Sequence, residues 1–198
     1  MATIRSRGRL PHWEAAQGIY FVTFRLADSL PKSVIKEIEF ERLNIVRTAQ
    51  AMGRELSPHE RNQLEELFTK KIDSYLDAGT GSCFLSSPIV AKMCAGTLRH
   101  FDAERYRLFA WCVMPNHVHV VFRPLEGHTL SEIIHSWKSF SAKEANRALR
   151  RSGEFWMHEY YDHLVRDEVE FDRIVDYVLR NPKKAGLRSW PWVGGEVS

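Results

Sequence analysis

Two histidines separated by one residue are the part of this sequence best suited to chemistry. His117 and His119 lie in the mostly apolar run HVHVVF at 117–122. Residues two apart on a β-strand project from the same face, so the two imidazoles would lie side by side. Two imidazoles can bind one divalent metal ion when a further ligand arrives from elsewhere in the chain. The same His-x-His pattern also occurs on ordinary strands, and the spacing alone leaves both interpretations open.

Tyr177 and Asn181 form a second pair of candidate residues. They are four apart in a segment whose pattern predicts a helix, so they share one face of it. Tyr177 lies at the flank of the apolar stripe, where its ring could pack against Ile174 while its hydroxyl faces a site. A tyrosine on an amphipathic helix is also a common packing residue, and an asparagine before proline commonly ends a helix.

Positive charge and aromatic side chains gather near both pairs. Phosphates attract cations and bases stack on aromatic rings, so this composition suits a single strand of nucleic acid. A solvent-exposed charged face beside an aromatic core cluster would have the same composition. The candidate DNA-binding residues are Arg147, Arg150, Arg151, Trp156, Tyr160, Tyr161, Arg180, Lys183 and Lys184.

The composition of the chain sets the class of protein. It has 198 residues, of which 44% are hydrophobic and 27% charged, as is typical of one soluble domain with a core. No apolar run approaches the roughly 18 residues of a membrane-spanning helix, and the first residues lack the apolar centre of a signal peptide. Three cysteines without C-x-x-C spacing suit a reducing cytosol. The net charge of +3 permits a nucleic-acid partner without requiring one.

The elements that must position the candidate residues are a mixture of helices and strands. Runs of β-branched and aromatic residues predict strands at 18–26, 106–113 and 117–122, the last two forming an antiparallel pair. Helical spacing and capping residues predict helices at 32–52, 57–79, 88–98, 129–149 and 167–181. The segment 155–166 is predicted to be extended or irregular. We predict one domain over 1–198 with a helical insertion at about 28–100.

Three stretches, taken together, resemble the REP-associated tyrosine transposases, bacterial relatives of the single-tyrosine transposases in the HUH endonuclease superfamily. The stretches are MPNHVHVV at 114–121, FWxHEYYDHLVR at 155–166 and YVLRNPKKAGL at 177–187. The resemblance covers 18–26 and nearly everything from about 81 to 187, and it is least informative for 32–78. It implies an α+β fold, with a ferredoxin-like antiparallel sheet, helices on one face and a helical insertion.

The resemblance also implies roles for individual residues. His117 and His119 match the metal ligands of the family, and Tyr177 matches its catalytic tyrosine. Asn181 falls where related insertion-sequence enzymes often have a glutamine as third metal ligand, so its shorter side chain departs from their pattern. The implied cofactor is one divalent ion, Mg²⁺ or Mn²⁺, and the imidazole ligands lead us to expect that Mn²⁺ works at least as well in vitro.

The implied activity is that of a DNA endonuclease and transposase. Such an enzyme cleaves and rejoins single-stranded DNA at hairpin, REP-like sequences through a 5′-phosphotyrosine intermediate. We expect it to act in the bacterial cytoplasm in association with the nucleoid, without a membrane, as a monomer or a homodimer. Two alternatives stay open: a non-catalytic module that binds hairpin DNA or RNA, and a metal-dependent hydrolase that uses water as its nucleophile.

Overall fold

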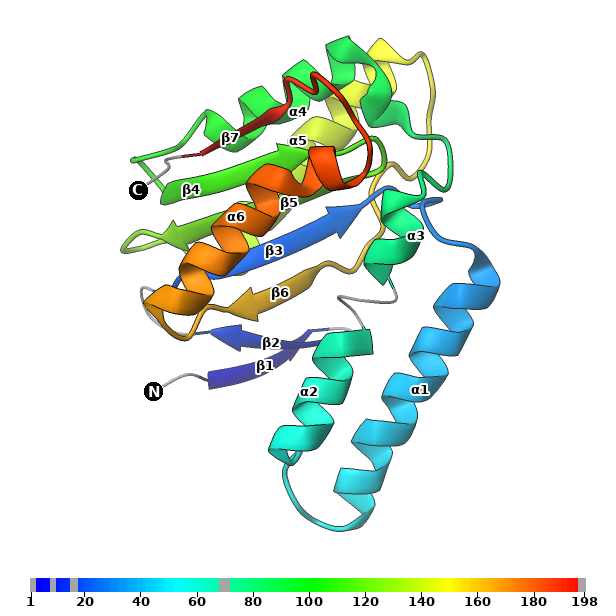
Figure 1. Ribbon diagram of the computed structural model, residues 1–198, viewed down its shortest axis with the longest axis vertical. Coiled ribbons are helices and arrows are strands. Elements are labelled where there is room, and N and C mark those ends of the chain that lie inside the picture. Colours follow the sequence, from blue (N-terminus) through cyan, green and yellow to red (C-terminus); the bar gives the residue numbers. More distant parts are fainter. Residues whose placement is uncertain (1–2, 8–9, 15–17, 68–71, 196–198) are drawn as a thin grey trace. The chain divides into compact units, whose positions relative to one another are not determined.

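The computed structural model describes residues 3–7, 10–14, 18–67 and 72–195 and divides the chain into two units. The first unit comprises 1–27 and 83–198, and the second comprises 28–82. The strands of the first unit are β1 (Thr3–Arg7), β2 (Leu10–Glu14), β3 (Tyr20–Arg25), β4 (Tyr106–Val113), β5 (His117–Pro124), β6 (Tyr161–Leu164) and β7 (Val193–Gly195). Its helices are α4 (Pro88–Arg99), α5 (Leu130–Ala148) and α6 (Glu168–Lys184), with a 3-10 turn at Phe84–Ser86 (Figure 1).

A five-stranded antiparallel sheet forms the centre of the first unit. Its strand order is β6-β3-β5-β4-β7, while β1 and β2 form a separate antiparallel pair. The register of β3 against β5 places Thr23 opposite His119 and Arg25 opposite His117. The register of β4 against β5 places Cys112 opposite His119 on the other side. The central strand β5 thus carries both histidines with a paired strand on each side.

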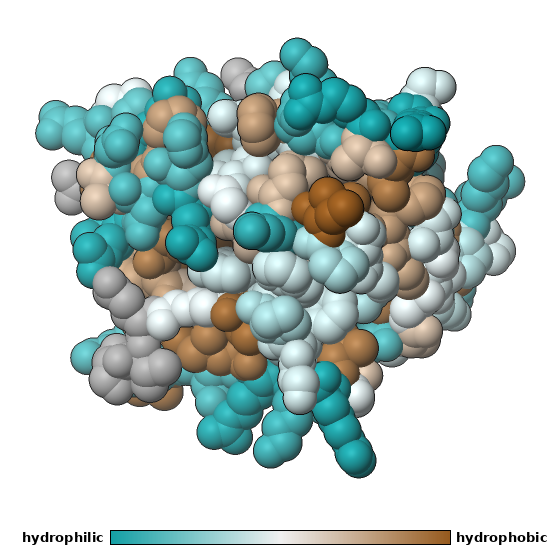
Figure 2. Space-filling view, turned by 90° about the horizontal axis from the view of Figure 1, so that it is seen from above, coloured by the Kyte–Doolittle hydropathy of each residue, from teal (hydrophilic) through white to brown (hydrophobic). Residues whose placement is uncertain are grey.

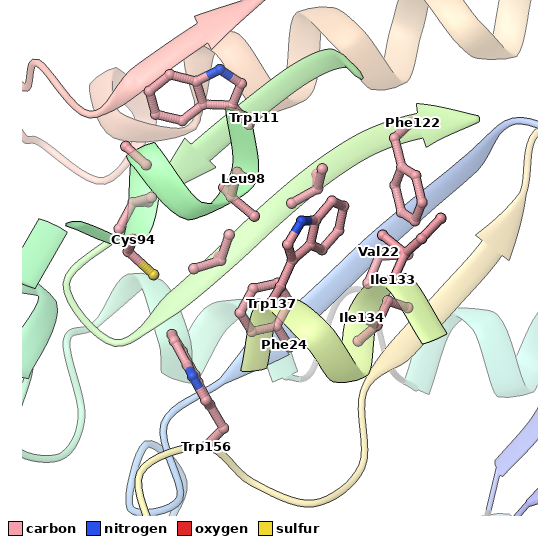
Figure 3. Close-up of a cluster of buried hydrophobic side chains, with 14 of the residues drawn as sticks. Val22, Phe24, Cys94, Leu98, Trp111, Phe122, Ile133, Ile134, Trp137 and Trp156 are labelled. Carbon is pink, nitrogen blue, oxygen red and sulfur yellow. The ribbon is translucent and has the colours of Figure 1, made fainter. Parts of the chain in front are cut away.

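Helices cover both faces of this sheet. On one face, Val22 and Phe24 of β3 pack with Ile134 and Trp137 of α5 in a cluster that also includes α4 (Figure 3). On the other face, Phe21 and neighbouring side chains pack against α6, which crosses in front of the strands in Figure 1. The predicted α+β class with an antiparallel sheet is confirmed. The expectation of helices on one face alone is corrected, because each face of the sheet carries a cluster of apolar side chains that a helix covers.

The described residues of the second unit include the helices α1 (Lys32–Ala51), α2 (Pro58–Glu66) and α3 (Asp73–Asp77). Val34 and Ile38 of α1 form a small buried apolar cluster with Leu67, against which Ile72 and Tyr75 pack. Ser57 caps α2 by accepting a hydrogen bond from the backbone N–H of Glu60, as the sequence pattern predicts. The predicted insertion at about 28–100 also included α4, which the structure places in the first unit, in the core over the sheet.

Most predicted elements are present, with differences at their ends. The strands predicted at 18–26, 106–113 and 117–122 correspond to β3, β4 and β5. Helix α6 continues through Pro182 to Lys184, past the end predicted at Asn181. Proline removes only one hydrogen bond in a last turn, where the N–H groups of Ala185 and Leu187 still bond to the carbonyls of Asn181 and Pro182 at 3.0 and 2.8 Å.

On the face shown in Figure 2, hydrophobic residues form separate small groups between hydrophilic side chains. Exposed large apolar residues of the first unit, such as Ile89, Phe140 and Val169, lie on three different helices. Among the described residues, no helix is both long enough and apolar enough to cross a membrane.

Candidate metal and nucleophile site

Strand β5 presents His117 and His119 to the face of the sheet that α6 covers. Both side chains have an exposed fraction of 0%. Their Nε2 atoms lie 3.0 Å apart, and the two ring planes meet at 76°. The prediction that the imidazoles project from one face of a strand is therefore correct in its geometry.

The outer nitrogen of each ring is held by a neighbouring side chain. Nδ1 of His117 lies 2.8 Å from Oδ1 of Asn116, and Nδ1 of His119 lies 2.7 Å from Oγ1 of Thr23. Metal-binding histidines commonly have such a partner on the nitrogen that does not bind the ion, because it fixes the orientation of the ring. These contacts turn both Nε2 atoms toward the same point.

The donor atoms fit a divalent metal ion. Two nitrogens that each lie about 2.1 Å from one ion, at about 90° to each other, are about 3.0 Å apart, which matches the Nε2 separation. Asn181 is also fully buried, and neither Oδ1 nor Nδ2 of its side chain has a hydrogen-bond partner. A buried carboxamide without a protein partner requires an explanation, and a bound ion is one of them. Within the described residues, no cluster of three or more His, Cys, Asp or Glu offers an alternative metal site.

Helix α6 brings Tyr177 onto the histidine pair. The ring centroid of Tyr177 lies 5.4 Å from that of His119 and 6.0 Å from that of Phe21, edge-on to both rings. Lys184, seven residues later on the same helix, places Nζ 5.5 Å from the centroid of the Tyr177 ring. Positions 177, 181 and 184 form one helical stripe, so candidate nucleophile, candidate ligand and cation share one face.

Polar side chains lie between the amino-terminal end of α6 and the sheet. Asp167 caps the helix by accepting a hydrogen bond from the N–H of Glu170 at 2.8 Å. The Glu170 carboxylate in turn lies 3.1 Å from Nε2 of His163 on β6 and accepts the N–H of Arg166 at 2.8 Å. These contacts support the orientation of the helix that carries Tyr177 and Asn181.

Burial keeps the two histidines neutral. It lowers the pKa of His119 to about 3, with a smaller contribution from the positive charge of Lys184. The pKa of His117 is also well below its usual range, because of burial and then of the charge that His119 would carry. A neutral imidazole has the lone pair that a metal ion requires, so the pair is ready for coordination at neutral pH.

These pKa shifts predict that acid destabilises the metal-free protein. A histidine whose folded-state pKa is depressed contributes stability above its unfolded pKa of about 6.5, and this is lost as the pH falls toward the folded-state pKa. For His119 the window runs from about 6.5 down to about 3. Urea unfolding at several pH values should show the free energy of unfolding falling by as much as roughly 1.4 kcal/mol per pH unit for each histidine.

One variant tests this assignment. His119→Gln should reduce the slope of stability against pH relative to the wild type. A free energy of unfolding that stays constant between about pH 7 and about pH 5 would contradict the buried, neutral state of both rings.

The three aromatic residues predicted to bind DNA lie in different environments. Trp156 is 4% exposed, packs on Phe24 and donates its indole N–H to Ser141, so its position favours a packing role. Tyr160 lines a pocket of about 780 Å³ beside α5, with Lys138 over its ring. Tyr161 pairs with Thr23 across β3 and β6 and contacts Phe21, so it lies on the α6 face.

The predicted basic residues are mostly exposed. Arg147 and Arg180 form ion pairs with Glu144 and Asp176 on their own helices. The guanidinium of Arg151 lies 4.6 Å from the ring centroid of Phe84. The remaining members of this group, all at exposed positions, are Arg150, Lys183 and Lys184.

Three residues at the site were not predicted from the sequence. Asn116 and Thr23 contact the histidines, and Arg25 lies directly opposite His117 in the sheet. Burial lowers the pKa of Arg25 to about 10, which leaves the guanidinium charged at neutral pH. The period-2 pattern of β3 places Thr23 and Arg25 on one face, but their approach to β5 depends on a pairing that the sequence does not show.

Comparison with known proteins agrees with this arrangement. The family model described as transposase IS200-like matches residues 87–181, a segment that contains both histidines, Tyr177 and Asn181. A REP-associated tyrosine transposase of Escherichia coli (strain K12) is 26% identical over 104 residues. A Haemophilus influenzae protein assigned to the same class is 24% identical over 110 residues. Each match covers 48% of this chain and 61% of the relative, so the chain spans less than two thirds of these curated relatives.

The fold is also that of a solved relative. A REP-associated tyrosine transposase bound to a REP hairpin matches with a TM-score of 0.50 and 18% identity, over 96% of this chain and 82% of that chain. Residues 87–181 are thus similar to the IS200-like transposases in sequence, and this segment carries both histidines, Tyr177 and Asn181. The curated relatives have the names that the sequence motifs suggested, so the resemblance to the REP-associated tyrosine transposases is confirmed.

Proposed function

We propose that this chain is a metal-dependent endonuclease and transposase that cleaves and rejoins single-stranded DNA at hairpin, REP-like sequences. The observation that carries the proposal is the meeting of three groups on one face of the sheet. Tyr177 lies against the paired imidazoles of His117 and His119, with the Lys184 ammonium over its ring. A tyrosine, a metal-binding donor set and a cation are the groups that phosphodiester transfer to tyrosine requires.

His117, His119 and Asn181 would hold one divalent ion, Mg²⁺ or Mn²⁺. When bound, the ion would supply Lewis-acid polarisation of a non-bridging phosphate oxygen. The buried imidazoles offer neutral nitrogens, and the partnerless Asn181 carboxamide offers an oxygen. Asn181 departs from the glutamine of related enzymes, and it is fully buried on α6, which packs on the sheet face that carries the histidines.

Tyr177 would act as the nucleophile. Its hydroxyl oxygen forms a bond to phosphorus while the bond from phosphorus to the 3′-oxygen breaks. The tyrosine loses its proton and the departing 3′-oxygen gains one, so protons and charge balance across the step. The products are a 5′-phosphotyrosine and a free 3′-hydroxyl, which can reverse the step without a nucleotide cofactor. Lys184 would stabilise negative charge next to the Tyr177 ring.

The partner would be hairpin or single-stranded DNA. The structural relative was solved with a REP hairpin bound, and the exposed cations of α5 and α6 suit phosphate binding. Arg25, charged and beside His117, would contact the scissile phosphate from the sheet. We place this activity on bacterial nucleoid DNA in the cytoplasm, carried out by a monomer or a homodimer.

Incubation with palindromic single-stranded oligonucleotides and Mn²⁺ tests the proposal. A denaturing gel should show a covalent protein–DNA adduct that depends on the ion and on a hairpin in the substrate. Cleavage without an adduct would indicate a hydrolase that uses water. Hairpin binding without cleavage would indicate a DNA- or RNA-binding module.

A further inference from the structure

Thr23 and Asn116 make different kinds of hydrogen bond to the histidine pair. The Oδ1 atom of Asn116 is a carbonyl oxygen and can only accept, so Nδ1 of His117 must donate to it. The hydroxyl of Thr23 can donate or accept, so it imposes no fixed role on Nδ1 of His119. The two rings are therefore constrained differently, although each has one close partner.

The contact between the two Nε2 atoms then determines the state of His119. Because Nδ1 of His117 carries the proton of that neutral ring, its Nε2 has only a lone pair. When no ion lies between the two rings, their Nε2 separation of 3.0 Å is a hydrogen-bond distance, and only Nε2 of His119 can then donate the proton. Nδ1 of His119 then has a lone pair, and the Thr23 hydroxyl donates to it at 2.7 Å.

Metal binding requires the opposite state of His119. A coordinated Nε2 must offer a lone pair, so the ring proton has to lie on Nδ1, where it needs an acceptor. The Thr23 hydroxyl can become that acceptor by rotating its hydrogen, without moving Oγ1. His117 needs no such change, because Asn116 already keeps its proton on Nδ1.

We infer that Thr23 is a positioning residue that supports both tautomers of His119, whereas Asn116 holds His117 in its metal-binding tautomer. This inference deepens the proposed function and rests on the metal site in it. Thr23 lies outside the segment 87–181 that the family model matches. The β3–β5 pairing is what brings its hydroxyl to the ring.

Thr23→Val is the informative change, because valine keeps the branched shape and removes the hydroxyl. The affinity for Mn²⁺, measured by electron paramagnetic resonance of the free ion, should fall by about 10- to 100-fold. Thr23→Ser should restore it to within about threefold, since serine retains the rotating hydroxyl. Thr97→Val, which removes the hydroxyl that donates to Met93 on α4, is a matched control and should bind Mn²⁺ like the wild type.

Nitrogen-15 NMR of labelled histidines gives a second readout that does not depend on activity. The metal-free protein should have the proton on Nδ1 of His117 and on Nε2 of His119. Adding Zn²⁺, a diamagnetic probe, should move the His119 proton to Nδ1. His119 with Nδ1 protonated in both states, or Thr23→Val with wild-type Mn²⁺ affinity, would overturn the inference. Failure of the proposed function is a separate result, namely a wild-type protein that forms no adduct with hairpin DNA.

Discussion

Tyr177→Phe should abolish the covalent adduct with hairpin DNA while leaving hairpin affinity nearly unchanged. Phenylalanine lacks only the hydroxyl, and the edge-on contacts with His119 and Phe21 involve the ring. Without a phenolic oxygen no bond to phosphorus can form at this position, so the expected loss is complete rather than partial. A denaturing gel measures the adduct, and a mobility shift on the same samples measures binding.

Tyr161→Phe is the most demanding control for that experiment. Tyr161 also lies on the α6 face and contacts Phe21, so it is the other tyrosine that the fold places near the site. Tyr160 lies on the opposite side, beside Lys138. Tyr160→Phe and Tyr161→Phe should both form the adduct. An adduct at normal rate with Tyr177→Phe would make Tyr161 the next candidate.

His117→Ala should remove Mn²⁺ binding and slow adduct formation by about 10³-fold. A metal ion that polarises the phosphate contributes several kcal/mol to the barrier, and each 1.36 kcal/mol corresponds to a factor of ten in rate. Single-turnover cleavage under saturating DNA measures the rate, and isothermal titration with Mn²⁺ measures the loss of the ion. Hairpin affinity should change little, because His117 is fully buried.

The controls for His117→Ala are a chelator added to the wild type and the substitution of an exposed histidine. EDTA should reproduce the His117→Ala defect in the wild type, and excess Mn²⁺ should reverse the effect of EDTA but not that of the variant. His158→Ala, at an exposed position, should cleave like the wild type. Equal cleavage by His117→Ala and the wild type would exclude a metal-binding role for this residue.

Local sequence patterns predicted most of the helices and strands, but they did not predict which distant segments contact each other. The capping boxes at Ser57 and Thr129 are visible in the sequence, and both are formed. Strand β7 was not predicted, because three residues with two glycines carry no alternating pattern. The packing of Trp156 was not predicted either. An aromatic residue next to basic residues gives the same sequence pattern whether it stacks on a base or packs on Phe24.

For the site, the sequence predicted which side chains share a face but not what surrounds them. The spacing of His117 and His119 on a strand, and of Tyr177 and Asn181 on a helix, is a local property. That α6 lies over β5 follows from apolar contacts of residues such as Val121 and Val178, far apart in the chain. The functional roles of these residues stay predictions until the variants are measured.

Strand β7 determines how the sheet ends on the β4 side. Along Ala110–Cys112 it occupies the hydrogen-bonding edge, and Trp190 donates its indole N–H to the carbonyl of Val113 just beyond. A Cβ at Gly195 would lie 2.6 Å from the carbonyl oxygen of Phe109, so the close approach requires glycine there. An open edge is a template for a strand from another molecule. A second copy could extend the sheet from this side only after β7 had been displaced from β4.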